Sequence, residues 1–179
     1  MSVLFIDDDS ELNYKTADSL GLNLIKMPYT ICGEEHYYDL GRNYDAKKFF
    51  DTVRAGNMPI TSGLNVETYK EYFEPYFKQG EDILYVSFSS QMSSTFTYMD
   101  IAVKELSEQY PAAKFRRFDT KGISMATGLC CYYAGIMHKE GKSNDEIIEF
   151  LDKFALRVNA VFSPNNLFHL KRGGRISAV

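Results

Sequence analysis

Short apolar runs alternate along the chain with stretches whose apolar residues recur every three or four positions. Runs of strand length and composition lie at residues 3–7, 22–31 (with a break at Pro28), 82–88, 113–119 and 158–163. Stretches with helical spacing lie at residues 11–21, 44–56, 65–80, 96–110, 123–141 and 143–154. Residues 32–39 predict a turn with a short strand, and residues 58–65 a loop. This alternation predicts an α/β fold with a mainly parallel sheet flanked by helices.

Two of the predicted helices carry clear local signals. The helix after Asn65 has one apolar stripe at positions i, i+3, i+4, i+7 and i+8, formed by Tyr69, Tyr72, Phe73, Tyr76 and Phe77. Asn65 suits its N-terminal cap, and Gly80 suits its end. Ser143 and Glu146 have the S-x-x-E spacing of a capping box, so they predict the start of the helix that follows.

Polar residues gather where two of the predicted strands end. "FIDDDS" closes the first strand, and a run of hydroxyls follows the strand at 82–88. These hydroxyls belong to Ser87, Ser89, Ser90, Ser93, Ser94 and Thr95. In parallel α/β sheets, ligands bind beyond the carboxyl ends of the strands. The loop with Thr61 and Ser62 precedes a helix and can reach the same edge, so its hydroxyls predict either helix capping or contact with an anion.

Asp7 and Asp9 form a D-x-D pattern after an apolar strand. Mg²⁺-dependent phosphatases of the haloacid-dehalogenase type place a nucleophile and an acid in this way. They also need a later acidic pair after a strand, which "VFSPNNL" does not supply. The same residues suit a strand-to-helix turn with acids at the positive end of a helix, or another polar role in a site. All three interpretations stay open.

The hydroxyl run raises the question of a serine nucleophile, which needs a neighbouring base. The G-x-S-x-G elbow is absent, and none of the three histidines, His36, His138 and His169, has an evident acidic partner. Ser93, Ser94 and Thr95 instead begin a helix after a strand, an arrangement that cradles an anion. Neutral hydroxyl and N–H donors suit one small headgroup such as a carboxylate.

Composition narrows the function further. The net charge is −4 and basic residues occur at most in pairs, so we expect no nucleic-acid partner. Three cysteines and the absence of a signal-like start indicate a reduced, cytoplasmic location. No apolar window is long enough to span a membrane. We expect no cofactor and, apart from the phosphatase interpretation of Asp7 and Asp9, no metal site. The basic turn "KRGGRI", with Arg175, suits either an exposed turn or contact with an acidic partner.

Five stretches occur in an order that resembles the DegV family of bacterial fatty-acid-binding proteins. They resemble the family patterns D-S-x-x-D-L, T-S-x-P, S-S-x-L-S-G-T-Y, D-[ST]-x-x-x-S-x-G and L-x-x-L-x-x-G-G-R-I. The stretches are "DDDSEL" (7–12), "TSGLN" (61–65), "SSQMSSTF" (89–96), "DTKGISMATG" (119–128) and "LFHLKRGGRI" (167–176). Together they cover essentially the whole chain.

The resemblance implies a non-catalytic, two-lobed α/β protein that encloses a long-chain fatty acid and presents its carboxylate to a fatty-acid kinase. The implied ligand-binding residues are Thr61, Ser62, Ser93, Ser94, Thr95 and Arg175. Ser94 stands where the family pattern has Gly, so its side chain either obstructs the headgroup or adds a hydrogen bond. Residues 1–179 correspond to the N-terminal lobe, and we expect the second lobe to be largely absent. An apolar groove exposed in this way would favour self-association.

Overall fold

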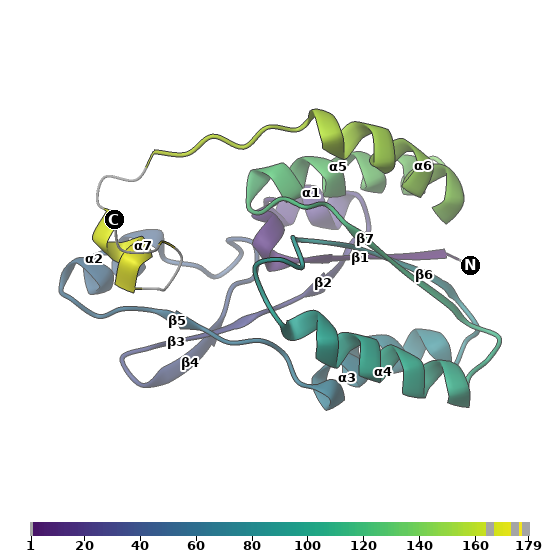
Figure 1. Ribbon diagram of the computed structural model, residues 1–179, viewed down its shortest axis with the longest axis horizontal. Helices are drawn as coiled ribbons and strands as arrows, with labels where there is room; N and C mark the ends of the chain where they lie inside the picture. Colours follow the sequence, from purple (N-terminus) through teal and green to yellow (C-terminus); the bar gives the residue numbers. More distant parts are fainter. Residues whose placement is uncertain (1, 164–166, 173–175, 177–179) are drawn as a thin grey trace.

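A parallel sheet of four strands forms the centre of the molecule (Figure 1). The computed structural model describes residues 2–163, 167–172 and 176. The strand order is β2-β1-β6-β7, and every neighbouring pair is parallel. The strands are β1 (Ser2–Asp7), β2 (Asn23–Ile25), β6 (Asp82–Ser87) and β7 (Lys114–Asp119). The predicted α/β fold with a mainly parallel sheet is therefore confirmed.

Helices cover both faces of this sheet (Figure 1). On one face lie α3 (Val66–Phe77) and α4 (Thr95–Gln109); on the other lie α1 (Tyr14–Ser19), α5 (Met125–Lys139) and α6 (Asn144–Phe154). Successive strand side chains point to opposite faces, so Leu84 joins the core under α5 and α6, whereas Ile83 and Tyr85 join the core under α3 and α4. Burial on both faces explains why β1 and β6 read as continuous apolar runs.

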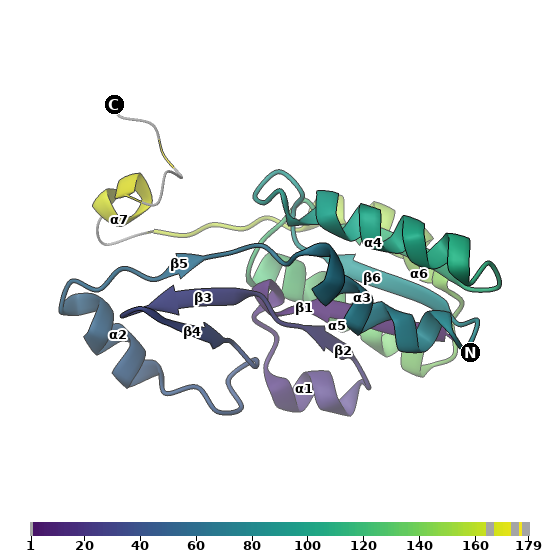
Figure 2. The ribbon, with the colours of Figure 1, turned by 90° about the horizontal axis from the view of Figure 1, so that it is seen from below.

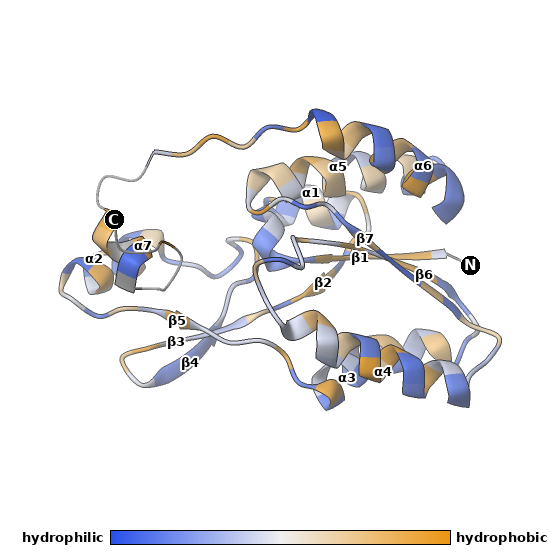
Figure 3. Ribbon diagram, viewed as in Figure 1, coloured by the Kyte–Doolittle hydropathy of each residue, from blue (hydrophilic) through white to orange (hydrophobic). Residues whose placement is uncertain are grey.

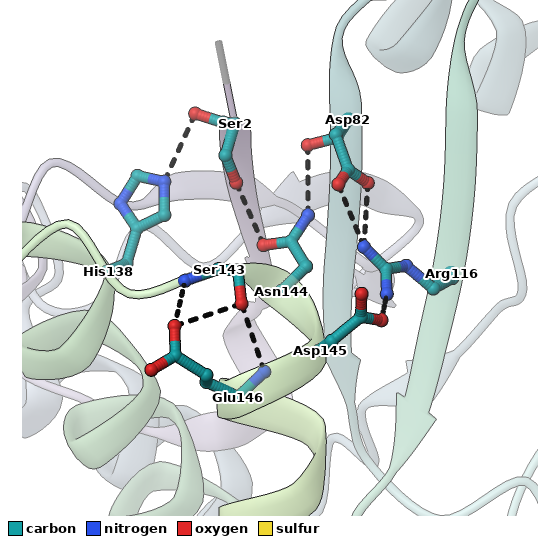
Figure 4. Close-up of polar contacts among 8 residues, drawn as sticks. All are labelled: Ser2, Asp82, Arg116, His138, Ser143, Asn144, Asp145 and Glu146. Atoms are coloured by element: carbon teal, nitrogen blue, oxygen red, sulfur yellow. Dashed lines mark hydrogen bonds and ion pairs between the residues drawn. The ribbon is translucent and has the colours of Figure 1, made fainter.

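The local helix signals are confirmed. Asn65 caps α3, its Oδ1 accepting a 2.9 Å hydrogen bond from the Thr68 N–H, and the stripe on this helix faces the core. Ser143 and Glu146 form the predicted capping box of α6 (Figure 4). None of the helices in the described part of the chain has an apolar stretch sufficient to cross a bilayer.

A second, antiparallel sheet lies beyond the carboxyl ends of the main strands (Figure 2). Its order is β4-β3-β5, and α2 (Ala46–Arg54) connects the last two of these strands in the chain. The strands are β3 (Pro28–Ile31), β4 (Glu34–Tyr37) and β5 (Ile60–Thr61). The segment predicted as a loop at 58–65 therefore contains a strand. Its residues Ile60 and Thr61 pair with Thr30 and Tyr29 of β3, which lie about thirty positions earlier in the sequence.

The helix predicted at 11–21 is shorter than its pattern. A 3-10 turn, η1 (Asp8–Ser10), follows β1, and Glu11 adopts a left-handed backbone with φ 50°. Asn13 then caps α1 by accepting a 3.0 Å hydrogen bond from the Lys15 N–H. The first residues of the predicted helix thus form the turn that leads from the sheet to α1.

The strand predicted at residues 158–163 is wrong. After α6 and the 3-10 turn η2 (Ala155–Arg157), these residues pair with no strand among the described residues. They carry hydrophobic side chains (Figure 3), yet Val161 is 95% exposed and Phe162 75% exposed. The segment leaves the main sheet and leads towards α7 (Leu167–Arg172) (Figure 1). An apolar pattern forms a strand only where a second strand offers its hydrogen-bonding edge.

Candidate functional site

Asp7, the last residue of β1, holds the start of the loop that follows β6. We call residues 86–96 the serine segment. Asp7 is fully buried, and its Oδ2 accepts hydrogen bonds from the Tyr85 hydroxyl (2.9 Å) and from the N–H of Phe88 (3.0 Å). Burial, with a further contribution from the charge of Asp9, raises the pKa of Asp7 to about 7. This carboxyl group therefore fixes the start of the serine segment from inside the core.

The neighbouring carboxyl groups of Asp8 and Asp9 are also largely buried in the folded protein. Asp8 accepts two hydrogen bonds (3.1 and 3.0 Å) from the N–H of Met27, and burial raises its pKa to about 8. Burial and the charge of Glu11 raise the pKa of Asp9 to about 6. Within the described residues, no group of three or more His, Cys, Asp or Glu side chains is arranged to hold a metal ion. The complete burial of Asp7 argues against its use as a phosphatase nucleophile.

Asp119, the last residue of β7, holds the middle of the serine segment. It accepts hydrogen bonds from the N–H (3.2 Å) and the hydroxyl (2.5 Å) of Ser90, and another from the Lys121 N–H (2.8 Å). Burial alone would raise the pKa of Asp119, but these hydrogen bonds outweigh it and lower the pKa below its ordinary value. The serine segment is thus fixed by one carboxylate from each strand beside β6.

Thr95 joins the serine segment to the loop at residues 61–65. Its side chain is 1% exposed, and its Oγ1 accepts a 2.9 Å hydrogen bond from the Leu64 N–H and lies 2.9 Å from the Tyr69 hydroxyl. A Cβ added to Gly63 would lie only 3.1 Å from the Thr95 Cβ, so the loop packs directly on the start of α4. Thr95 therefore supports the site from the interior.

Ser93 and Ser94, just before α4, are less buried than Thr95. Ser93 is half-buried, and its Oγ accepts a 3.2 Å hydrogen bond from the N–H of Thr95. Ser94 is the N-cap residue of α4 and is exposed, and its side chain makes no capping hydrogen bond. These two hydroxyls lie at the helix start that the sequence predicted as an anion cradle.

Thr61 and Ser62 are brought to the same region by the second sheet. Both side chains are exposed, and the Ser62 N–H donates a 3.0 Å hydrogen bond to the Pro28 carbonyl. Through Leu64 and Thr95 their loop is attached to the start of α4. Arg175, the other predicted ligand-binding residue, lies outside the described residues.

An apolar groove adjoins Thr61. Its volume is about 440 Å³, and five of its thirteen described lining residues are aromatic and come from β3, α2 and the segment between β4 and α2. We call this the aromatic groove. It is lined by Asp8, Asp9, Glu11, Met27, Tyr29, Tyr38, Tyr44, Phe49, Phe50, Pro59, Thr61, Ile123 and Ser124. The abundance of Tyr and Phe was the one signal of such a groove in the sequence, but it could not show which of the 26 aromatic residues form it.

The histidines with described side chains lie away from the serine segment. His36 is on β4, where its ring stacks on Tyr29 with 5.4 Å between centroids. His138 Nε2 lies 3.1 Å from the Ser2 carbonyl, at the amino end of β1 (Figure 4). The side chain of His169 lies outside the described residues. Neither described imidazole serves as a base for a serine of this segment.

Comparison with known proteins gives one consistent result. A sequence model of the DegV family, described as uncharacterised proteins, matches residues 3–179. A DegV domain-containing protein of Clostridium perfringens is 38% identical over 176 residues, which cover 98% of this chain and 60% of the relative. The chain thus spans about 60% of the length of the first curated relatives that it matches.

Solved structures share the fold. A DegV family protein from Thermus thermophilus, described as binding fatty acid, has a TM-score of 0.80 at 22% identity, over 97% of this chain and 60% of its own. A DegV family protein from Eubacterium eligens, loaded with heptadecanoic acid, has a TM-score of 0.75 at 19% identity, over 99% of this chain and 62% of its own. On the match of the family and of the Clostridium relative, this chain belongs to the DegV family.

Proposed function

We propose that this chain is the N-terminal lobe of a non-catalytic, cytoplasmic fatty-acid-binding protein. The aromatic groove would receive the acyl chain, and the hydroxyls around the start of α4 would receive the carboxylate. One observation carries the proposal: Thr61 lines the apolar groove while its loop is hydrogen-bonded, through Leu64, to Thr95 at that helix start. The volume of about 440 Å³ also lies within the range of roughly 300–1,000 Å³ usual for small-molecule sites.

The donors suit a carboxylate headgroup. Thr61, Ser62 and Ser94 are exposed and Ser93 is half-buried, so four hydroxyls lie at or near one helix N-terminus. Backbone N–H groups at such a terminus lack partners within the helix and favour an anion. Ser94 makes no capping hydrogen bond, so its hydroxyl is one more donor for the ligand. Thr95 acts behind them as the buried support.

Two relatives support the choice of ligand. The Thermus thermophilus protein is described as binding fatty acid, and the Eubacterium eligens protein is loaded with heptadecanoic acid. Because the hydroxyls of Ser62 and Ser94 are exposed, a carboxylate held there is reachable from outside. We therefore extend the proposal to presentation of the acid to a fatty-acid kinase, with Arg175 contributing either to acid binding or to contact with the kinase.

Ser93→Ala tests the proposed function. We expect the variant to bind hexadecanoic acid about five-fold more weakly, since one hydrogen bond is worth about 1 kcal/mol. Affinity can be measured by displacement of a fluorescent fatty acid, and bound lipid by native mass spectrometry of the purified chain. Ser107→Ala, an exposed position on the same helix, is the matched control and should bind as the wild type does.

Two results would contradict the proposal. One is wild-type protein that binds no fatty acid, or binds it equally after Ser93→Ala. The other is Mg²⁺-dependent phosphate release that is lost in Asp7→Asn, which would establish the phosphatase interpretation instead.

A further inference from the structure

The charges around the proposed site pose a problem for an anionic ligand. Asp8, Asp9 and Glu11 line the aromatic groove, and no Lys or Arg is among the described residues that line it. The hydroxyl and N–H donors at the start of α4 carry no full charge, so they favour a carboxylate over an alcohol only through their partial charges. A cation close to the serine segment would make this preference strong.

Arg117 is placed to be that cation. It lies on β7 opposite Tyr85, and its Cζ is 4.3 Å from the centroid of the Phe96 ring. Its Nη1 lies 3.5 Å from the Ser87 Oγ, at the outer limit of a hydrogen bond. Since Ser87 and Phe96 stand near the two ends of the serine segment, the half-buried guanidinium lies alongside that segment.

Among the described residues, no ion pair neutralises the charge of Arg117. Within the described residues, no carboxylate oxygen lies within 4.0 Å of it. Its positive charge contributes to lowering the pKa of Asp119, which holds Ser90, and acts against the rise in the pKa of Tyr69, whose hydroxyl contacts Thr95. The positive charge of Arg117 thus acts on both Asp119 and Tyr69, which contact the serine segment through Ser90 and Thr95.

The adjacent residue Arg116 shows the opposite arrangement. Its side chain points to the other face of the sheet, where it pairs with Asp82 at 2.8 Å and with Asp145 (Figure 4). Two carboxylates therefore compensate its charge. Arg116 and Arg117 are the same residue type at consecutive positions, and among the described residues only Arg117 has no carboxylate partner within ion-pair distance.

We propose that Arg117 determines headgroup specificity, making the site select a carboxylate over a neutral headgroup on the same acyl chain. The inference rests on the proposed function and names the residue that sets its ligand class. Packing on an aromatic face holds a guanidinium in place without removing its charge. Partial burial strengthens its attraction for an anion, because the effective dielectric constant is lower there than in water.

The test compares hexadecanoic acid with hexadecan-1-ol at pH 8. Dissociation constants are measured for the wild-type chain, Arg117→Met, Arg117→Lys and the control Arg116→Met. We expect Arg117→Met to weaken binding of the acid about ten-fold and to leave the alcohol nearly unchanged, the order of magnitude for one lost charge interaction across partly hydrated protein. Arg117→Lys should retain most of the preference, and Arg116→Met should keep the wild-type ratio of acid to alcohol affinity.

A ratio of acid to alcohol affinity that is the same in Arg117→Met as in the wild type overturns the inference, as does an equal fall in Arg116→Met. If Arg117→Met does not fold, salt titration of the wild type decides: added NaCl should weaken binding of the acid and not of the alcohol, and equal behaviour overturns the inference. Failure of the proposed function looks different, because the wild type then binds neither ligand and the inference falls with it.

Discussion

At the scale of single residues, buried acids at the strand ends organise the site. Asp7 receives two donors on one oxygen, while its Oδ1 has no hydrogen-bond partner within the described structure. A carboxyl group in such surroundings is easier to bury in its neutral form. The D-x-D pattern therefore marks a residue that positions the serine segment, and the same burial makes the stability of the fold depend on pH.

We expect the free energy of unfolding to fall as the pH rises from 4 to 8. The pKa of Asp7 is about 7 in the folded protein and near its ordinary value of 3.8 when unfolded. The stabilisation from its bound proton is therefore complete below pH 3.8 and is lost as the pH rises through 7. Each such proton contributes a slope of about 1.4 kcal/mol per pH unit. Asp8 and Asp9, whose pKa values are also raised, act in the same direction.

Asp7→Asn removes one of these titrating carboxyl groups, so it measures the contribution of Asp7 to the pH dependence. Its amide oxygen can still accept from Tyr85 and Phe88, so the variant should fold but show a shallower dependence of stability on pH between 4 and 7. Urea unfolding at pH 5, 6 and 7 measures the slope. An unchanged slope would show that Asp7 is ionised throughout this range.

At the scale of elements, close backbone approach fixes how α5 sits on the turn after β1. A Cβ added to Gly128 would lie 2.4 Å from the Ser10 carbonyl oxygen, a backbone atom that cannot move without shifting η1. At Gly135, on the same helix, the added Cβ would meet the end of the flexible Leu20 side chain at 2.9 Å. Helical spacing alone gives no sign of this difference between the two glycines.

Gly128→Ala should therefore destabilise the protein, although Gly→Ala inside a helix ordinarily stabilises it by about 1 kcal/mol. Overpacking of this kind costs roughly 1–3 kcal/mol. Thermal unfolding followed by circular dichroism measures the change, with Gly135→Ala as the matched control, for which we expect a smaller loss. A variant at Gly128 as stable as the wild type would mean that α5 and η1 separate easily.

At the scale of the whole molecule, an apolar groove open to solvent favours association. Phe50 is 48% exposed in the aromatic groove, so two copies of the chain could cover each other there. We propose that the chain self-associates through this groove and that a fatty acid competes with the association.

Sedimentation velocity tests this proposal. We expect added hexadecanoic acid to shift the chain towards the monomer, and Phe50→Ser to do the same without ligand. Ile101→Ser, which alters an exposed apolar residue on α4 away from the groove, is the control. A dimer that persists through both treatments would place the contact elsewhere.

The sequence by itself determined the features that depend on near neighbours in the chain. The apolar stripe of α3, the cap at Asn65 and the capping box of α6 follow from side chains three or four residues apart. The buried strands β1 and β6 follow from unbroken apolar runs. The sequence grouped Thr61 and Ser62 with Ser93 and Ser94 only through its resemblance to the DegV family. The structure adds the hydrogen bond between Leu64 and Thr95 that joins their two segments.

Only the tertiary structure decided the features that depend on distant residues meeting. It showed that residues 158–163 pair with no described strand, that β5 pairs with β3, and that Thr95 is a buried support. It also separated Arg116 from Arg117, which the sequence gives as an identical pair. Neighbouring residues on a strand point to opposite faces, so one guanidinium meets two carboxylates and the other lies on Phe96 beside the serine segment. Their charges act differently because the surroundings of a charge come from whatever the fold packs around it.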